Sequence, residues 1–213
     1  MEDGLWGIAL LDAAAREATL FAGIWFLVGA LDDLAVDLLY AAGRLRRRSA
    51  GVPMDAAVSG SFAVFIPAWD EVAVIEPMLR AALARFDWPD YRLYVGTYPN
   101  DRATIAAVAG VAEADARVRL VIGERPGPTT KADCLNKLWR ALLRDEAAGE
   151  PVRAIVLHDA EDVVHPAEFR VFAHYLEHGD AVQLPVLPLR HRASRLVSGH
   201  YIDEFCEKNC ALS

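Results

Sequence analysis

Residues 156–166 read VLHDAEDVVHP, and they place three carboxylates directly after a run of apolar side chains. A short apolar run followed by polar residues predicts a buried strand, which here ends near Asp159. In open sheets of parallel strands, ligands bind beyond the carboxyl ends of the strands. We therefore expect Asp159, Glu161 and Asp162 to lie at a ligand site on this edge of a sheet.

Several carboxylates at the end of a central strand form a hard-oxygen site of the kind that holds Mg²⁺ or Mn²⁺ beside phosphate groups. Strand alternation puts Asp159 and Glu161 on one face and Asp162 on the other, unless the backbone turns after Ala160. The sequence does not decide which of Glu161 and Asp162 reaches a metal. The alternative is that one acid caps the helix expected to begin near Pro166, which accounts for one carboxylate but not for three.

Outward from this stretch, apolar runs alternate with segments of helical spacing. This alternation predicts βαβ units and an α/β fold, with a mostly parallel sheet flanked by helices. The other strand ends carry PAWDE (67–71), YPND (98–101) and ERPGPTTK (124–131), all polar and unlike ordinary turns. Strands are expected at 62–68, 91–98, 117–123, 154–159 and 181–187, and helices at 71–86, 103–116, 131–148 and 166–178.

Composition sets the class of protein. The 213 residues suffice for one α/β domain with an appendage, and with 54% hydrophobic residues the chain can bury a sizeable core. The net charge of −8 argues against nucleic acid as a partner, because neutralising phosphates requires clustered Lys and Arg. Three cysteines without a C-x-x-C pair indicate neither a disulfide framework nor a zinc site.

The segment 19–48, TLFAGIWFLVGALDDLAVDLLYAAGRLRRR, predicts a membrane-spanning helix, because its apolar part (20–42) has about the length that crosses a bilayer. Asp32, Asp33 and Asp37 interrupt it, and intramembrane carboxylates usually face a protein partner or a polar cavity. The alternative is an amphipathic or core helix of a soluble protein. The arginines at 44 and 46–48 predict that the chain after them is cytoplasmic.

We divide the chain into a membrane anchor (1–48), a linker rich in small residues (49–61) and a third segment (62–213). VFIPAWDE (64–71), KADCLN (131–136), HDAED (158–162) and VQLPV (182–186) together resemble motifs of the family 2 glycosyltransferases, which have the GT-A nucleotide-sugar fold. The resemblance implies that the third segment is a nucleotide-sugar-binding domain. GALDDLAVDLLY (29–40) and VGTYPNDRAT (95–104) further resemble the membrane glycosyltransferases of the bacteriophage adsorption protein B type.

The resemblance implies a UDP- or GDP-sugar donor, a divalent metal (Mg²⁺ or Mn²⁺) and a place at the bacterial inner membrane, with the domain on the cytoplasmic side. It further implies a role in surface polysaccharide synthesis, with other inner-membrane or export proteins as partners. By position, it implies that Trp69 and Glu71 border the nucleoside, Asp101 contacts the base, Lys131 lies near the diphosphate, Asp159 contacts ribose or phosphate, and Glu161 or Asp162 holds the metal.

The sequence departs from the family pattern in two places. Trp69-Asp70 and YPND replace the usual Tyr-Asn and Asp-Asp-Gly-Ser. A later acid that would act as general base, and a Q-x-x-R-W motif, are also not found. The catalytic base therefore stays unidentified, and the chain is expected to be the donor half of a C-terminally truncated enzyme. The competing hypothesis is an inactive nucleotide-binding or scaffolding fragment held at the membrane.

Overall fold

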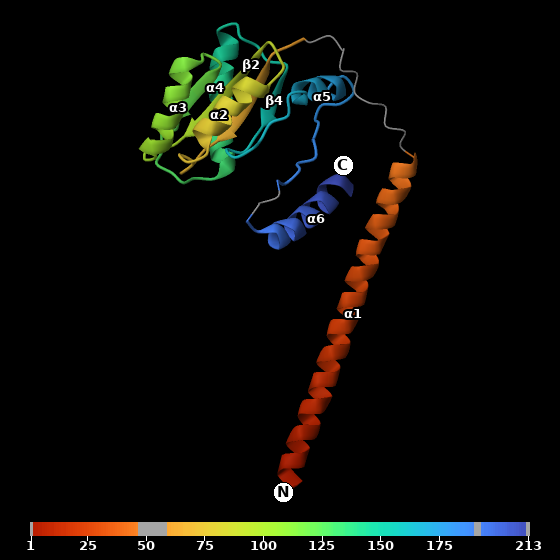
Figure 1. Ribbon diagram of the computed structural model, residues 1–213. Coiled ribbons are helices and arrows are strands. Elements are labelled where there is room, and N and C mark those ends of the chain that lie inside the picture. Colours follow the sequence, from red (N-terminus) through yellow and green to blue (C-terminus); the bar gives the residue numbers. More distant parts are fainter. Residues whose placement is uncertain (1, 47–58, 190–192, 212–213) are drawn as a thin grey trace. The chain divides into compact units, whose positions relative to one another are not determined.

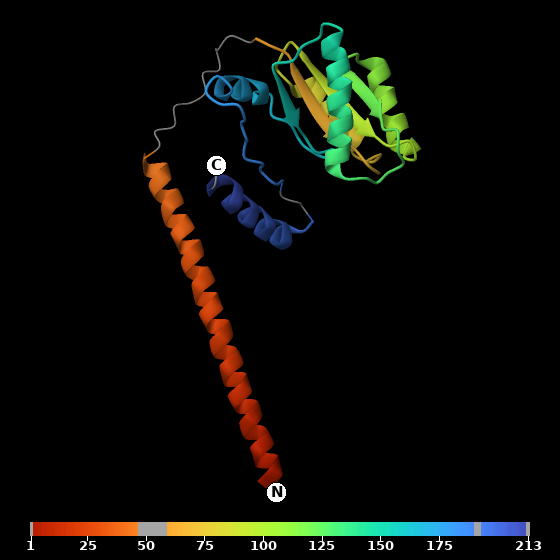
Figure 2. The same cartoon turned by 180° about the vertical axis from the view of Figure 1, so that it is seen from behind.

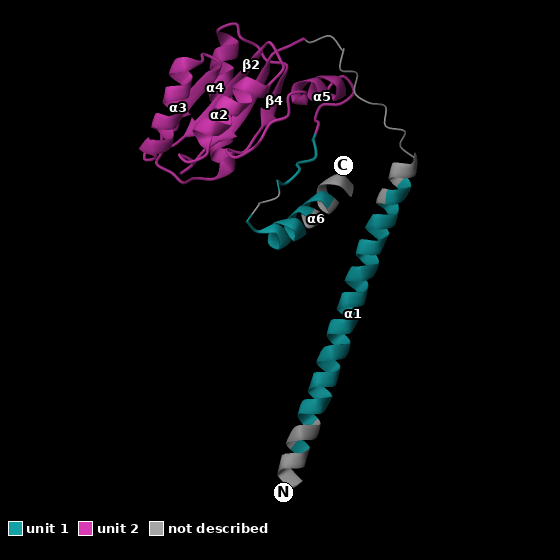
Figure 3. Cartoon of the chain, viewed as in Figure 1, with its two compact units in different colours: residues 1–51, 183–213 teal, residues 52–182 magenta. Residues whose placement is uncertain are grey.

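The computed structural model describes residues 2–46, 59–189 and 193–211 (Figure 1). The chain divides into two compact units, residues 52–182 and residues 1–51 with 183–213 (Figure 3). Most of the expected linker, residues 49–58, lies outside the described residues. The division into anchor, linker and domain therefore remains a prediction.

The first of these units, residues 52–182, contains a parallel sheet and is called the sheet unit. Its strands are β1 (Phe62–Pro67), β2 (Tyr91–Thr97), β3 (Val118–Ile122) and β4 (Ala154–Leu157), in the order β3-β2-β1-β4. The two central strands, β1 and β2, are buried on both faces, which explains why they read as continuous apolar runs instead of alternating ones. The predicted α/β fold with a mostly parallel sheet flanked by helices is confirmed.

The fifth predicted strand is wrong, because residues 181–187 are described and form no strand. Pro185 lies inside this segment and Pro188 follows it directly. A proline has no backbone N–H to donate to a neighbouring strand, so the apolar pattern here is not matched by pairing capacity. Hydropathy alone therefore overestimated the sheet by one strand.

Helices cover both faces of the sheet. One face packs against α2 (Ile75–Arg85), α3 (Arg102–Ala114) and α5 (Glu168–Tyr175), and the other packs against α4 (Lys131–Ala147), which lies in front of the sheet in Figure 2. The segment predicted to begin α2 at residue 71 instead forms a turn, in which the N–H of Val74 donates to the carbonyl of Glu71 at 3.1 Å. The loop after β1 is thus free to present its side chains at the sheet edge.

An aromatic cluster anchors α5 to the sheet. The Phe169 ring is fully buried and stacks on Phe62 of β1 and on Phe86, with ring centroids 4.9 Å and 4.2 Å away. Trp88 and Tyr91 complete the cluster. These contacts hold α5, and with it the end of the acidic loop after β4, on the sheet.

Helix α4 approaches β2 closely at Gly96, where a Cβ would lie 2.5 Å from the Cys134 sulfur and 3.1 Å from Leu138. Gly96→Ala should therefore lower the free energy of unfolding by about 1–3 kcal/mol, the usual penalty for overpacking a core. Urea denaturation of the full chain in detergent checks this. Gly110→Ala is the matched control, because Gly110 is exposed on α3 with open space around it and alanine favours helices by about 0.5–1 kcal/mol. Equal effects of the two substitutions would contradict the close packing of α4 on β2.

The second unit contains α1 (Glu2–Arg46) and α6 (Arg195–Ala211). Within α1, residues Leu10–Leu39 are long and apolar enough to cross a membrane, by length and composition. At about 1.5 Å per residue these 30 residues extend about 45 Å, more than the roughly 30 Å hydrocarbon core of a bilayer. The apolar N-terminal helix is confirmed, and its insertion into a membrane remains a prediction.

Candidate functional site

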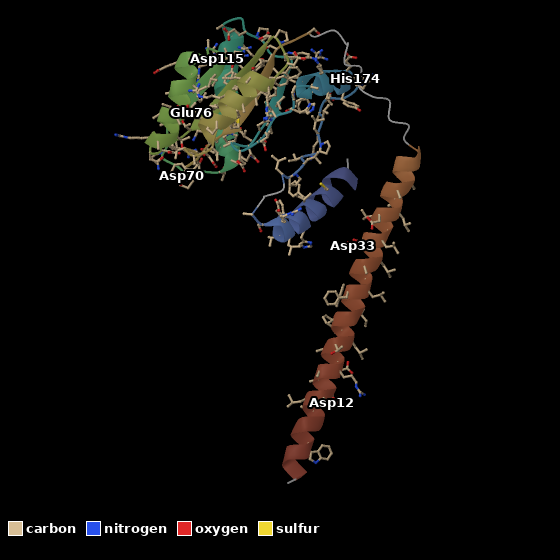
Figure 4. All side chains as sticks on the ribbon, viewed as in Figure 1. Asp12, Asp33, Asp70, Glu76, Asp115 and His174 are labelled. Atoms are coloured by element: carbon tan, nitrogen blue, oxygen red, sulfur yellow. The ribbon has the colours of Figure 1, made fainter. Side chains whose placement is uncertain are left out.

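The residues expected at the site lie at the carboxyl edge of the sheet. Trp69 and Glu71 follow β1, Asp101 follows β2, Lys131 begins α4, and Asp159 follows β4. Figure 4 labels Asp70 at this end of the sheet unit and Asp115, which precedes β3, at the other end. Because all four strands are parallel, segments distant in sequence meet at one edge.

Asp101 ties the loop after β1 to the start of α3. Its carboxylate accepts the N–H of Thr104 at 3.2 Å as the N-cap of α3, and it accepts the N–H of Asp70 at 2.7 Å. The Thr104 hydroxyl accepts the N–H of Glu71 at 3.1 Å. Burial raises the pKa of Asp101, but these hydrogen bonds outweigh it and hold the pKa below its ordinary value, so the carboxylate stays charged.

Asp70 adopts a left-handed backbone conformation with φ of 58°. Among residues with a Cβ, aspartate and asparagine tolerate this conformation best, and strained residues of this kind gather at binding sites. The turn directs the N–H of Asp70 at the Asp101 carboxylate. Trp69 and Glu71 precede and follow Asp70 in the chain. The sequence reading of PAWDE as an unusual turn therefore has a structural basis.

The acidic loop after β4 turns within four residues. The N–H of Asp162 donates to the carbonyl of Asp159 at 3.2 Å, and the Asp162 carboxylate accepts the N–H of Asp159 at 2.8 Å. The backbone thus turns after Ala160, so strict strand alternation does not apply to Glu161 and Asp162. The Asp159 carboxylate forms an ion pair with the ammonium of Lys131, and both side chains are more than half exposed.

Negative charge converges on Glu71. Burial and then the charges of Glu161, Asp70, Asp101 and Asp159 raise the pKa of Glu71 above its ordinary value. Acids from three different strand ends are therefore close enough to repel one another. A cation placed among them would relieve this repulsion.

The donor chemistry fits a hard divalent cation, since carboxylate oxygens are the ligands such ions prefer. Within residues 2–46, 59–189 and 193–211, no group of three or more His, Cys, Asp or Glu side chains is arranged to hold a metal by itself. Mg²⁺ and similar ions are commonly bound by one or two carboxylates together with substrate phosphates. The arrangement therefore suits an ion that arrives with a phosphorylated ligand.

The repulsion predicts a pH-dependent stability. An acid with a raised pKa makes its contribution to stability below its ordinary pKa of 4.5, and it loses that contribution as the pH rises through the window above 4.5. Glu71→Gln removes this loss. Without ligand, the free energy of unfolding at pH 7 minus that at pH 4 should therefore be larger for Glu71→Gln than for the unsubstituted chain. Urea denaturation at both pH values checks this, with Glu113→Gln on the exposed side of α3 as the control for charge removal. A loss of stability at pH 7 in Glu71→Gln would show that the charged form is stabilising.

Sequence reasoning missed a set of residues beside Trp69. Tyr98 is almost fully buried, its ring meets the Trp69 ring edge-on at 5.3 Å, and its hydroxyl lies 3.0 Å from that of Thr129. Asn100 hydrogen-bonds both backbone polar groups of Gly127, at 2.7 Å and 2.8 Å. The polar YPND stretch marked this strand end, but pairing with residues 27 to 31 positions later left no local signal.

A buried pair, His158 and Glu168, supports the acidic loop from behind. The His158 ring nitrogen lies 2.6 Å from the Glu168 carboxylate, and both residues are only 9% exposed. The pair joins the last residue before Asp159 to the first turn of α5. This contact also spans the loop and was not predicted from the sequence.

Comparisons with known proteins show the family of the chain. Residues 59–212 match the family model described as "Glycosyltransferase like family 2". The bacteriophage adsorption protein B of Escherichia coli strain K12 is 37% identical over 200 residues, which cover 89% of this chain and 27% of that protein. The bacteriophage N4 adsorption protein B of Escherichia coli O157:H7 gives the same values. The chain thus spans about a quarter of the length of these relatives, and the predicted resemblance is confirmed.

Two solved structures are also similar. The mannosyltransferase PcManGT from Pyrobaculum calidifontis, in complex with GDP-Man and Mn²⁺, aligns with a TM-score of 0.49 and 21% identity over 73% of this chain and 46% of that one. S. aureus TarS 1-349, in complex with UDP-GlcNAc, aligns with a TM-score of 0.41 and 13% identity over 62% of this chain and 38% of that one.

Proposed function

The chain belongs to glycosyltransferase family 2, and from this premise we propose that it binds a nucleotide-sugar donor, a UDP- or GDP-sugar, at the carboxyl edge of its sheet and transfers the sugar. The observation that carries the proposal is the gathering of acids from three strand ends around Glu71, one of which, Asp159, pairs with the Lys131 ammonium. A divalent cation would neutralise the negative charge of the acids, and a diphosphate would neutralise the positive charge of Lys131. The parallel sheet flanked by helices is the GT-A-like fold that the sequence predicted.

Glu161 is the better candidate than Asp162 for the metal ligand. One Asp162 oxygen already accepts the N–H of Asp159, so this residue shapes the turn. Glu161 is exposed, and after burial its charge raises the pKa of Glu71 more than any other neighbouring charge does. When bound, the cation would stabilise the negative charge that develops on the departing nucleoside diphosphate.

The other residues divide between the nucleoside and the phosphates. We assign Trp69 and Glu71 to the nucleoside, since they lie in the turn that Asp101 holds. Asp101 is assigned to the base, although its carboxylate already accepts two backbone N–H groups. Lys131 would exchange its ion pair with Asp159 for the diphosphate, leaving Asp159 to contact ribose or phosphate.

The N-terminal helix is proposed as a membrane anchor. Its span Leu10–Leu39 has the required length and composition, and arginines at 44 and 46–48 follow it in the sequence. By the positive-inside rule, the sheet unit would then lie on the cytoplasmic side of a bacterial inner membrane. We assign the activity to surface polysaccharide synthesis, with inner-membrane or export proteins as partners, on the resemblance to membrane glycosyltransferases.

The test of the activity is donor turnover. The purified chain, residues 1–213, is incubated in detergent with Mn²⁺ and each of a panel of UDP- and GDP-sugars, and nucleoside diphosphate release is measured with and without membrane extract as an acceptor source. Release that depends on one sugar supports the proposal. Binding without release for every donor would instead identify a nucleotide-binding or scaffolding chain.

Extraction of the expressed chain from membranes by alkaline carbonate would contradict the membrane anchor.

A further inference from the structure

The segment 124–130, ERPGPTT, is held at both ends by α4. Asp133 in the first turn of α4 accepts hydrogen bonds from Arg125 at 2.7 Å and from the Thr129 hydroxyl at 2.8 Å. Hydrogen bonds from Lys137 and Thr129 lower the pKa of Asp133 to about 2, so this carboxylate is charged at neutral pH. The ends of the segment are therefore fixed independently of its middle.

Gly127 lies in the middle of the segment. Both of the described hydrogen bonds that reach it are made with Asn100. The Asn100 amide donates to the Gly127 carbonyl at 2.8 Å, and its oxygen accepts the Gly127 N–H at 2.7 Å. Asn100 itself is exposed, in the turn after β2, so it has no role in filling the core. Its two bonds fix the position of one backbone unit in both directions.

Gly127 lies directly against the aromatic pair beside the donor site. A Cβ on Gly127 would meet the Tyr98 ring at 2.6 Å and the Trp69 ring at 2.8 Å. The Tyr98 ring is fixed from several sides, by its bond to Thr129 and by the Lys137 ammonium 4.7 Å from its centroid. Trp69 is only partly buried, so contact with the Gly127 backbone limits the positions that its ring can take.

We propose that Asn100 is a positioning residue for the nucleoside end of the donor site. By holding Gly127 through both backbone polar groups, it keeps the 124–130 segment against the Trp69 ring and so fixes the ring for contact with a nucleoside diphosphate. Asn100 acts through Trp69 and does not itself touch the ligand. This inference rests on the proposed function, because it takes Trp69 to border the nucleoside.

The first arm of the test needs no ligand. The full chain, with 5-fluorotryptophan at its five tryptophans, is studied in detergent micelles by fluorine NMR, and the Trp69 resonance is assigned with Trp69→Phe. Asn100→Ala should shift or broaden the Trp69 resonance and leave that of Trp88 unchanged, since Trp88 donates to Gly60 at 2.9 Å in another part of the sheet unit. Asn100→Asp, which keeps the shape and only the acceptor bond, provides a second variant. An unchanged Trp69 resonance in both variants overturns the proposal.

The second arm is a double-mutant cycle on nucleotide affinity. Calorimetric titration with UDP, or with GDP if that nucleotide binds, is carried out in Mn²⁺ on the unsubstituted chain, Asn100→Ala, Trp69→Ala and the double variant. Asn100→Ala should weaken binding about tenfold, as expected for losing two hydrogen bonds. The double variant should bind no more weakly than Trp69→Ala, because Asn100 acts through Trp69.

Additive losses in the cycle would overturn the proposal, since they would mean that Asn100 acts apart from Trp69. Glu113→Gln, on the exposed side of α3, is the control and should bind like the unsubstituted chain. If the unsubstituted chain binds neither UDP nor GDP, the proposed function fails. The fluorine spectra then still decide whether Asn100 positions Trp69.

Discussion

Glu161→Gln should weaken the Mn²⁺-dependent binding of UDP or GDP by about 100-fold, the upper range found when groups that support a metal are removed. Glutamine keeps the size of the side chain and removes its charge. The Glu161 charge raises the pKa of Glu71, so Glu161 lies close enough to act on an acid that follows another strand. Calorimetric titration of each variant with the nucleotide, at fixed Mn²⁺, measures the change.

Two acids serve as matched controls for this prediction. Asp162→Asn should affect stability more than affinity, because it alters the bond between Asp162 and the N–H of Asp159 that shapes the turn. Glu177→Gln removes an exposed charge beyond the end of α5 and should change neither. If Asp162→Asn abolished the Mn²⁺ effect while Glu161→Gln retained it, the two acids would have exchanged roles.

Phe169→Ala should lower the free energy of unfolding of the sheet unit by about 3–5 kcal/mol, the range observed when a large buried aromatic side chain is truncated. Phe169 is fully buried and stacks against Phe62 and Phe86, so the cavity would open between β1, α2 and α5. Urea denaturation of the full chain in detergent, followed by near-ultraviolet circular dichroism, reports the loss of this aromatic packing.

Tyr175→Ala on the same helix provides the comparison, because Tyr175 is 46% exposed. Its effect should be at most about 1 kcal/mol, as for surface positions in general. Equal destabilisation by the two substitutions would contradict this account. It would show that the aromatic cluster is not what holds α5 on the sheet. The acidic loop would then lack the rigid support that the structure gives it.

The regular elements could be predicted because their signals are local. The buried runs of β1 and β2 and the helical spacing of α3 and α4 are present in the sequence itself, and the observed bounds of these four elements lie within two residues of the expected ones. The 181–187 segment shows the limit of this reasoning. Its apolar residues resemble a strand, yet Pro185 limits the pairing that a strand requires.

The candidate site could be predicted in outline because parallel strands bring their carboxyl ends together. The sequence therefore located Glu71, Asp101, Lys131 and Asp159 on one edge. It could not show how each carboxylate is used, since hydrogen bonds join residues about 30 positions apart. Asp101 shows both cases: its capping of α3 through Thr104 is local, whereas its bond to the N–H of Asp70 joins residues 31 positions apart.

The acidic edge also explains why a ligand site works against stability. Acids gathered from separate loops repel one another, as the raised pKa of Glu71, caused first by burial and then by Glu161, shows. Other charges in the sheet unit are paired, as in the contact of Arg92 with Glu150 at 2.5 Å. Acids held close enough to repel one another are a pattern expected where a cation and a phosphate ligand bind.

The most direct test of the central claim is calorimetric titration of the full chain with UDP and with GDP, each with and without Mn²⁺, repeated on Asp159→Ala. We expect one nucleotide to bind, with an affinity that rises at least about tenfold in Mn²⁺ and falls in the variant. Tight binding that neither Mn²⁺ nor the substitution changes would contradict the account, because the acids after β4 would then have no part in holding the ligand.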